Sequence, residues 1–281
     1  MNVTTRDPAV LARAEVILRA GSGDRLRTSF PLAPLTTFRI GGPAALYLEP
    51  ESEADLRAAG QAVRETGVPF VVLGKGSNVL VSDEGFPGLV LRLGKGYRWA
   101  ARDGGRITGG GSMPLPRLAG VALSHGLAGL EFGVAIPATL GGAVRMNAGA
   151  HGHSLDEVVD QVEVFLLGAG DPGEIRARMD EAREWRRRTQ PLAEPNCGSV
   201  FKNPPDGHAA RMIESLGLKG ASAGGAQVSE KHANFIVARP GTRAADVVAL
   251  IRSVQEQVAD RYGVRLEPEV HLVGSFDVTP I

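Results

Sequence analysis

The chain has 281 residues, of which 43% are hydrophobic and 22% charged, as is ordinary for a globular protein with real cores. Lysine plus arginine and aspartate plus glutamate both total 31, so no overall charge favours nucleic acid or an acidic membrane as a partner. The single cysteine, Cys197, excludes an internal disulfide and fits a reducing compartment. No apolar run approaches the roughly 20 residues of a membrane span, so a cytoplasmic protein is expected.

The first third of the chain predicts an α/β unit over residues 25–93, preceded by a helical extension over residues 1–24. Charged residues interrupt the apolar run of 7–20, which therefore favours an amphipathic helix over a signal peptide. Ser52, with Asp55 three residues later, predicts the start of a second helix. Its buried stripe is expected at Leu56, Ala59 and Val63. Strands are expected over 45–49, 68–74, 79–83 and 88–93.

The middle third, residues 94–190, predicts a second unit that contains helices and a strand. A helix is expected over 115–126, and a strand over 161–168. The long glycine-rich stretch 129–154 has too little periodicity for a regular element. Asp171 as N-cap, with Pro172 at the first helical position, predicts a helix over 171–188.

The last third, residues 191–281, predicts a separate α+β unit after a proline-containing linker over 189–198. A short helix is expected over 208–217, followed by strands over 226–229 and 234–239. A long helix is expected from Thr242, with a buried stripe of Val247, Leu250, Ile251, Val254, Val258 and Tyr262. The chain should close with a strand over 264–274 that carries Glu267 and Glu269.

Two glycine-rich segments have the composition of ligand-binding loops. LGKGSNVLVSD (73–83) is neither a dinucleotide fingerprint nor a P-loop, because Val79 replaces the third glycine and no lysine follows the second. Its backbone N–H groups, with Ser77 and Asn78, could still bind an anion, although a plain hairpin turn explains the sequence equally well. In IPATLGGAVRMNAGA (136–150), Gly141 and Gly142 would let the backbone approach a flat ligand, and the alternative is a loop packed on itself.

The remaining polar clusters favour structural roles. Four arginines near the end of the 171–188 helix are typical of a solvated face, the alternative being a diphosphate site; they are Arg183, Arg186, Arg187 and Arg188. None of the six histidines has metal-ligand spacing, so no metal is expected. Cys197 has no identifiable partner base and favours a small buried thiol over a nucleophile.

NCGSVFKNPPDG (196–207) contains the most informative serine of the chain. Ser199 is not in a nucleophile elbow, because Phe201 stands where the second glycine belongs. A serine without a base is a poor nucleophile but an adequate proton donor, and a carboxylate such as Glu269 could orient it. The alternative is a serine that caps a loop and a glutamate that faces solvent.

Six segments together give the chain a family resemblance; they are TTFRIGGPA, LGKGSNVLVSD, GLEFGVAIPATLGGAVRMNAGA, TQPLAEPNCGSVFKNP, LKG with GGAQVSEKHANFIV, and LEPEVHLVG. Their order resembles that of the UDP-N-acetylenolpyruvoylglucosamine reductase family. The resemblance covers nearly the whole chain from Pro31. It implies an α+β protein with a vanillyl-alcohol-oxidase-type FAD-binding fold of two α/β subdomains and a C-terminal substrate-binding domain. It also implies a monomeric enzyme of peptidoglycan synthesis that uses FAD and NADPH to reduce UDP-N-acetylglucosamine enolpyruvate.

The resemblance also implies roles for particular residues. Ser199 matches the proton donor, and Glu269 matches the carboxylate that assists at the enol. Lys202 and Asn203 match positions that contact the substrate. The positions implied to bind FAD are Arg39, Gly74, Lys75, Gly76, Ser77, Asn78, Ile136, Pro137, Gly141, Gly142, Asn147 and Gly149.

The sequence departs from the family pattern near residues 165–170. A hairpin and a Tyr-Arg-x-Ser segment, whose arginine is catalytic in the family, have no counterpart; Arg145 or one of the Arg183–Arg188 cluster would have to replace that charge. Ala135 and Ala138 also stand where glycines are usual, which would cost about 1 kcal/mol if either needed a positive φ. The alternatives are therefore a working reductase, a non-catalytic flavin-binding relative, and an oxidase that uses oxygen.

Overall fold

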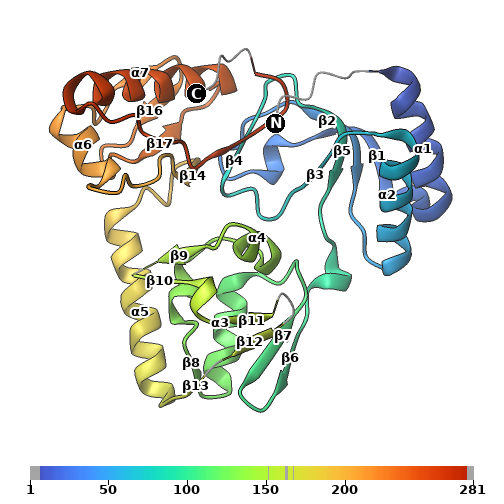
Figure 1. Cartoon of the computed structure of the whole chain (residues 1–281), viewed down its shortest axis with the longest axis horizontal. Helices are drawn as coiled ribbons and strands as arrows, with labels where there is room; N and C mark the ends of the chain where they lie inside the picture. The colour runs from blue at the N-terminus through green and yellow to red at the C-terminus, as the bar shows by residue number, and fades with distance from the viewer. Residues whose placement is uncertain (1–6, 151, 162–163, 167, 277–281) are drawn as a thin grey trace.

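The computed structural model describes residues 7–150, 152–161, 164–166 and 168–276, and forms three packed parts around a common centre (Figure 1). Each part has its own cluster of buried apolar side chains, and the first part has two. Five short 3₁₀ turns connect the larger elements; they are Gly23–Arg25, Ala33–Leu35, Lys95–Tyr97, Glu131–Ala135 and Leu155–Glu157. None of the helices in the described ranges has the length and apolarity to span a bilayer.

The first part is a mixed sheet packed against two helices. Its strand order is β1 (Leu26–Pro31), β2 (Pro43–Leu48), β5 (Phe86–Leu91) and β3 (Phe70–Val72), with only the β1–β2 pair antiparallel. The predicted helix at the N-terminus is α1 (Pro8–Ser22), which packs on α2 (Glu53–Thr66) and places Ala14 and Leu18 in the same core. This helix is therefore an integral layer of the first part.

Helix α2 begins as the sequence predicts, with Ser52 as N-cap and Asp55 completing a capping box. The fully buried Asp55 also accepts hydrogen bonds from the backbone N–H groups of Glu51 and Ser52, and from Arg25. Of the predicted stripe, Ala59 is buried and Val63 is half-buried against the same core, whereas Leu56 is only half-buried; the smaller Ala58 and Ala62 are more buried than either.

The middle part is an antiparallel sheet with a helical layer. Its order is β11 (Val159–Gln161), β12 (Val164–Leu166), β7 (Arg106–Gly109) and β6 (Ala100–Asp103). Helices α3 (Leu115–Ser124) and α5 (Pro172–Thr189) share its core, and Asp171 is the N-cap of α5 as predicted. The remaining short strands form two pairs, which are β8 (Leu127–Ala128) with β13 (Gly168–Ala169), and β9 (Gly149–Ala150) with β10 (His153–Ser154).

Two predictions for the middle part are wrong. The single strand expected over 161–168 divides among β11, β12 and β13, and residues 162–163 and 167 lie outside the described ranges. The glycine-rich stretch also contains a regular element, the short helix α4 (Leu140–Arg145), which begins at Thr139 because that hydroxyl accepts from the backbone N–H of Gly142. A helix of this length is too short to produce a readable apolar period.

The C-terminal part is an antiparallel sheet in the order β14 (Asn196–Ser199), β17 (Phe235–Ala238), β16 (Ala226–Val228) and β15 (Ser222–Ala223). The strand β14 starts inside the predicted linker. Helices α6 (Ala209–Ser215) and α7 (Ala244–Tyr262) share the core of this part. Five of the six predicted stripe residues of α7 are buried, but Tyr262 is 40% exposed because it lies at the end of the helix.

The chain returns to the first part at its end. Strand β18 (His271–Val273) pairs in parallel with β4 (Val79–Val81). The predicted strand over 264–274 is thus wrong for Glu267 and Glu269, because β18 begins only at His271. The residue between these two glutamates, Pro268, forms an isolated bridge with Phe201. A second link comes from Asp83, whose carboxylate accepts the backbone N–H groups of Ala244 and Ala245 at the start of α7.

Candidate active site

The glycine loop 74–78 lies between β3 and β4, which pair with different strands in different sheets. The hairpin interpretation of this sequence is therefore excluded. Gly76 has φ +69°, and a Cβ there would lie 2.3 Å from the carbonyl oxygen of Leu35. Its own carbonyl accepts both the backbone N–H and the hydroxyl of Thr37. Glycine is required here by close backbone approach as well as by φ.

The loop offers hydrogen-bond donors to a ligand. Within the described part of the chain, the backbone N–H groups of residues 75–78 donate to no protein acceptor. Gly76 is buried and Ser77 and Asn78 are half-buried, so these donors are partly withdrawn from solvent. Successive N–H groups in a glycine turn form an anion-binding concavity, which fits the diphosphate of a dinucleotide such as FAD.

Replacing Gly76 with alanine is expected to destabilise the protein more than the same change at Gly67. Gly67 has almost the same φ, +68°, but a Cβ there meets nothing within 4 Å. Gly67→Ala should therefore cost about 1 kcal/mol for the backbone conformation alone. Gly76→Ala adds about 1–3 kcal/mol for the clash with Leu35. Urea unfolding of both variants measures the difference, and equal values would mean that the loop can move away from Leu35 freely.

The two predicted glycine segments meet in the structure. A Cβ at Gly74 would lie 2.6 Å from the hydroxyl oxygen of Thr139 at the start of α4. A third segment, residues 110–113, contacts the second of these segments and was not predicted. The backbone N–H of Gly141 donates to Gly111, and that of Leu140 donates to Met113. The run of three glycines at 109–111 could have indicated this segment, because residues without side chains allow the close backbone contact between Gly111 and Gly141.

Two of the predicted FAD-binding residues have unusual backbone conformations. Among the described residues other than glycine, only Ser29, Arg39 and Asn147 have positive φ; Arg39 is at 59° and Asn147 at 44°. Such conformations cost of order 1–2 kcal/mol and often mark functional sites. Asn147 is held there because its side-chain oxygen accepts the N–H of Asp156. Arg39 is exposed on the loop before β2.

The other predicted positions of the second glycine segment surround α4. Ile136 is half-buried and Pro137 is exposed just before the helix, and Gly149 pairs with Ser154 in the hairpin after it. Neither Ala135 nor Ala138 has a positive φ. The alanines at these positions therefore introduce no backbone strain.

Ser199 and Glu269 are brought into neighbouring segments. Ser199 ends β14, and the next residue, Val200, accepts the backbone N–H of Glu269 at 2.7 Å. The isolated bridge between Phe201 and Pro268 continues this pairing. Both Ser199 and Glu269 are half-buried, so their side chains are sheltered without being enclosed. The backbone pairing therefore places Ser199 and Glu269 on neighbouring segments.

Asn78 joins the glycine loop to the Glu269 segment. Its side-chain amide donates to the carbonyl of Glu269 at 3.2 Å, and its own carbonyl accepts the N–H of His271 at 3.1 Å. A Cβ added to Gly198 would lie 3.8 Å from the carbonyl of Ser77, so β14 runs beside the same loop. A ligand on this loop would therefore lie beside Ser199 and Glu269.

Burial controls the protonation of the groups around Ser199. It raises the pKa of Glu269, and the positive charge of Lys202 opposes that shift. It also raises the pKa of Cys197, which is 1% exposed, so the thiol remains neutral. A neutral buried thiol is a weak nucleophile, which favours the structural interpretation of Cys197.

The two predicted substrate-binding residues have partners within the protein. Lys202 is exposed and forms an ion pair with Glu267. The side-chain oxygen of Asn203 accepts the backbone N–H of Ala209 at the start of α6, at 3.1 Å. Both lie on the segment that directly follows Ser199, at the edge of the candidate site.

The arginine cluster of α5 is mostly a solvated helix face. Arg183 pairs with Asp180, and Arg187 pairs with Glu184, in exposed ion pairs. Arg186 differs, because it is half-buried and donates to the neutral side chain of Gln190. Burial lowers the pKa of Arg186 to about 10.

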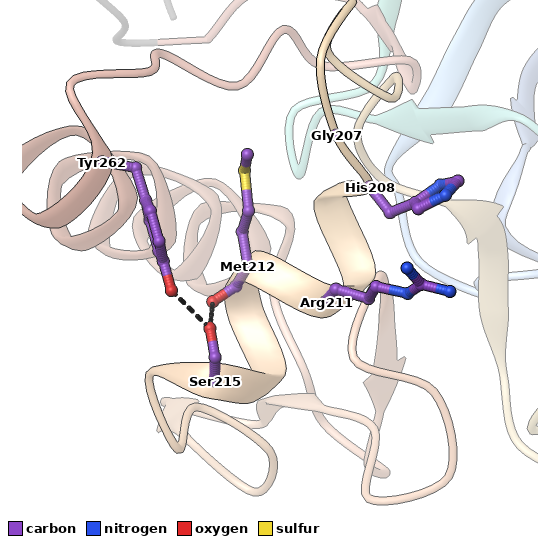
Figure 2. A pocket seen from close by; sticks show the side chains of 6 residues that line it. All are labelled: Gly207, His208, Arg211, Met212, Ser215 and Tyr262. Carbon is purple, nitrogen blue, oxygen red and sulfur yellow. Dashed lines mark hydrogen bonds between the residues drawn. The ribbon is translucent and has the colours of Figure 1, made fainter.

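A hollow on the outer side of the C-terminal part is separate from this site (Figure 2). It has a volume of about 330 Å³ and lies beside α6 and the end of α7. The hydroxyls of Ser215 and Tyr262 point toward each other at 2.6 Å, while His208 and Arg211 point away from them. None of the predicted site residues lines this hollow.

Two family models match the chain. One describes an FAD binding domain and matches residues 44–174, and the other describes the C-terminal domain of UDP-N-acetylenolpyruvoylglucosamine reductase and matches residues 190–273. Together they span the glycine loops and the Ser199–Glu269 pair.

Curated proteins and a solved structure are similar over most of the chain. The UDP-N-acetylenolpyruvoylglucosamine reductase of Heliobacterium modesticaldum is 42% identical, covering 87% of this chain and 89% of that protein. The reductase of Anaeromyxobacter sp. (strain Fw109-5) is also 42% identical, with 94% and 93% covered. The crystal structure of the reductase from Thermus caldophilus superposes with a TM-score of 0.71 at 33% identity, covering 88% of this chain and 98% of that one. The fold, the paired glycine loops and these similarities lead to one assignment: the chain belongs to the UDP-N-acetylenolpyruvoylglucosamine reductase family.

Proposed function

We propose that this chain is the NADPH-dependent flavoenzyme that reduces UDP-N-acetylglucosamine enolpyruvate to UDP-N-acetylmuramate for peptidoglycan synthesis. The observation that supports this most directly is the junction at Asn78. Asn78 belongs to the loop suited to the FAD diphosphate, and its side chain donates to the carbonyl of Glu269. The backbone N–H of Glu269 in turn donates to the carbonyl of Val200, the residue after Ser199. A cofactor and an enolpyruvyl group placed at this junction would be in contact.

FAD and the residues of the junction would have different roles in the reaction. Bound FAD would supply hydride transfer from NADPH to the enolpyruvyl methylene carbon. Ser199 would donate a proton to the carbon beside the carboxylate, which becomes enolate-like. Glu269 would hold that enol through a hydrogen bond with its carboxyl group, whose pKa is raised by burial. Lys202 and Asn203 would contact the substrate at the edge of the site.

The non-catalytic alternative receives no support from the described geometry. Ser199 and Glu269 are both present in adjacent segments, and the loop donors at 75–78 are available to a ligand. We expect the enzyme to act as a monomer in the cytoplasm, where NADPH and nucleotide sugars are made.

The test is an anaerobic visible spectrum of the purified protein during two successive titrations. NADPH should bleach the flavin band, and UDP-N-acetylglucosamine enolpyruvate should restore it. Recovery with oxygen but not with the UDP-sugar would instead identify an oxidase. Absence of a flavin band, or no recovery after substrate, would identify a binding relative without this activity.

A further inference from the structure

Three basic residues lie on separate segments that contact the glycine loop 74–78 or the chain around Glu269. Arg145 is the last residue of α4 in the middle part, Lys202 follows β14, and His271 begins β18. All three residues are exposed, so none of them belongs to a core. In Figure 1, α4 lies at the edge of the middle part that faces β4 and β14.

Backbone contacts hold these segments together. The start of α4 touches Gly74, and the other end of the same glycine loop binds His271 through the carbonyl of Asn78. Lys202 is fixed beside them because its backbone N–H donates to the carbonyl of Glu267 at 2.9 Å. These contacts link the segments that carry the three residues, and they do not depend on the basic side chains themselves.

The charges interact across this space. Burial, followed by the positive charges of Arg145 and Lys202, lowers the pKa of His271. The charge of Lys202 also acts on Glu269. Arg145 is therefore close enough to His271 to disfavour a second positive charge there, although the two residues belong to different parts of the molecule.

The local charge balance leaves Arg145 available to an anion. Lys202 is already paired with Glu267, whereas Arg145 forms no ion pair with any residue that the structure describes. Three exposed arginines of α5 differ in this respect, since Arg178, Arg183 and Arg187 each pair with a carboxylate. A guanidinium held beside two other basic groups repels them, and a bound carboxylate would relieve that repulsion.

We propose that Arg145 binds the carboxylate of the enolpyruvyl group. This inference rests on the proposed function and names the residue that holds one end of its substrate. The carboxylate is favoured over the diphosphate because Arg145 acts on His271, which lies two residues after Glu269 in the segment assigned to the enolpyruvyl end. Arg145 would also supply the positive charge for which no Tyr-Arg-x-Ser segment is present in the sequence.

Two ligands that differ in the carboxylate test the proposal. UDP-N-acetylmuramate carries the carboxylate, and UDP-N-acetylglucosamine lacks it. Calorimetric titration of the FAD-loaded protein should show that Arg145→Gln weakens binding of UDP-N-acetylmuramate by about 10–100-fold, as expected for loss of a charge-assisted hydrogen bond. Binding of UDP-N-acetylglucosamine should change less than about 2-fold, because Arg145 would not touch it. Arg145→Lys should retain part of the preference, since it keeps the charge.

Two further variants complete the design. Arg183→Gln is the matched control, an exposed arginine in an ion pair on α5, and should leave both affinities unchanged. Arg186→Gln tests the half-buried rival on the same helix. A selective loss with Arg186→Gln instead of Arg145→Gln would overturn the proposal, as would equal weakening of both ligands by Arg145→Gln. These outcomes are independent of whether the flavin band recovers in the titration that tests the overall activity.

Discussion

Replacing Ser199 with alanine is expected to slow reoxidation of the reduced flavin by the enolpyruvyl substrate by about 10²–10⁴-fold, the usual contribution of a positioned proton donor. Reduction of the flavin by NADPH should keep its wild-type rate, because no proton from Ser199 is needed in that half-reaction. Stopped-flow absorbance under anaerobic conditions separates the two steps.

Ser124→Ala provides a matched serine control. Ser124 lies at the end of α3, where its hydroxyl donates to the carbonyl of Val121 on the surface of the middle part. Neither half-reaction should change in that variant. If Ser199→Ala retained the wild-type rate of reoxidation, another group would have to be the proton donor.

Replacing Asp55 with alanine is expected to lower the free energy of unfolding by about 2–4 kcal/mol. The side chain is fully buried and accepts bonds from Arg25 and from the backbone N–H groups of Glu51 and Ser52. Its removal leaves those donors without an acceptor. The loss should stay below that of a fully enclosed ion pair, because Arg25 is 49% exposed and can still reach water. Urea unfolding measures the change.

A control on the same helix separates the effect of the buried hydrogen-bond network on stability from the effect of a negative charge. Glu53 forms an ion pair with Arg57 in which both side chains are more than three-quarters exposed, at 78% and 77%. Glu53→Ala should therefore change stability by less than about 0.5 kcal/mol. Similar losses in the two variants would mean that the charge of the first helical turn matters and the buried network does not.

The pH dependence of Asp55→Asn follows from the same network. Burial alone would raise the pKa of Asp55, but its hydrogen bonds with Arg25, Glu51 and Ser52 lower it overall, from 3.8 to about 2. Because the folded pKa is depressed, the stabilisation is complete above the unfolded value of about 4 and is lost as the pH falls toward 2. The stability difference between wild type and Asp55→Asn should shrink across that window, and a constant difference would contradict the assignment.

Local sequence signals predicted most of the helices correctly. Ser52 with Asp55, and Asp171 with Pro172, mark helix starts through hydrogen bonds made within one turn, and both helices begin there. The short helix α4 was missed because its start depends on Thr139 alone and its length is below two turns. The strand pairs at β4 and β18 could not be predicted, since parallel pairing across about 190 residues leaves no local pattern.

The candidate site was only partly readable from the sequence. The resemblance supplied Ser199 and Glu269, but nothing in either segment indicated that Val200 and Glu269 would share a backbone hydrogen bond. The left-handed conformations of Arg39 and Asn147 were also hidden, because residues other than glycine rarely adopt them. The proximity of Arg145 to His271 depends on how two parts of the molecule pack, which single-sequence patterns do not encode.

The pairing of β4 with β18 has a consequence for the order in which the protein can mature. Every described partner strand of β4 comes from residues made about 190 positions later, and the helix that Asp83 caps is also made after β4. A nascent chain can build the sheet of β1, β2, β3 and β5 early, but β4 has no described strand partner until residues 271–273 have been made. FAD should therefore be captured only after β18 has been made, and until then the uncovered edge of β4 is open to chaperones or to mispairing.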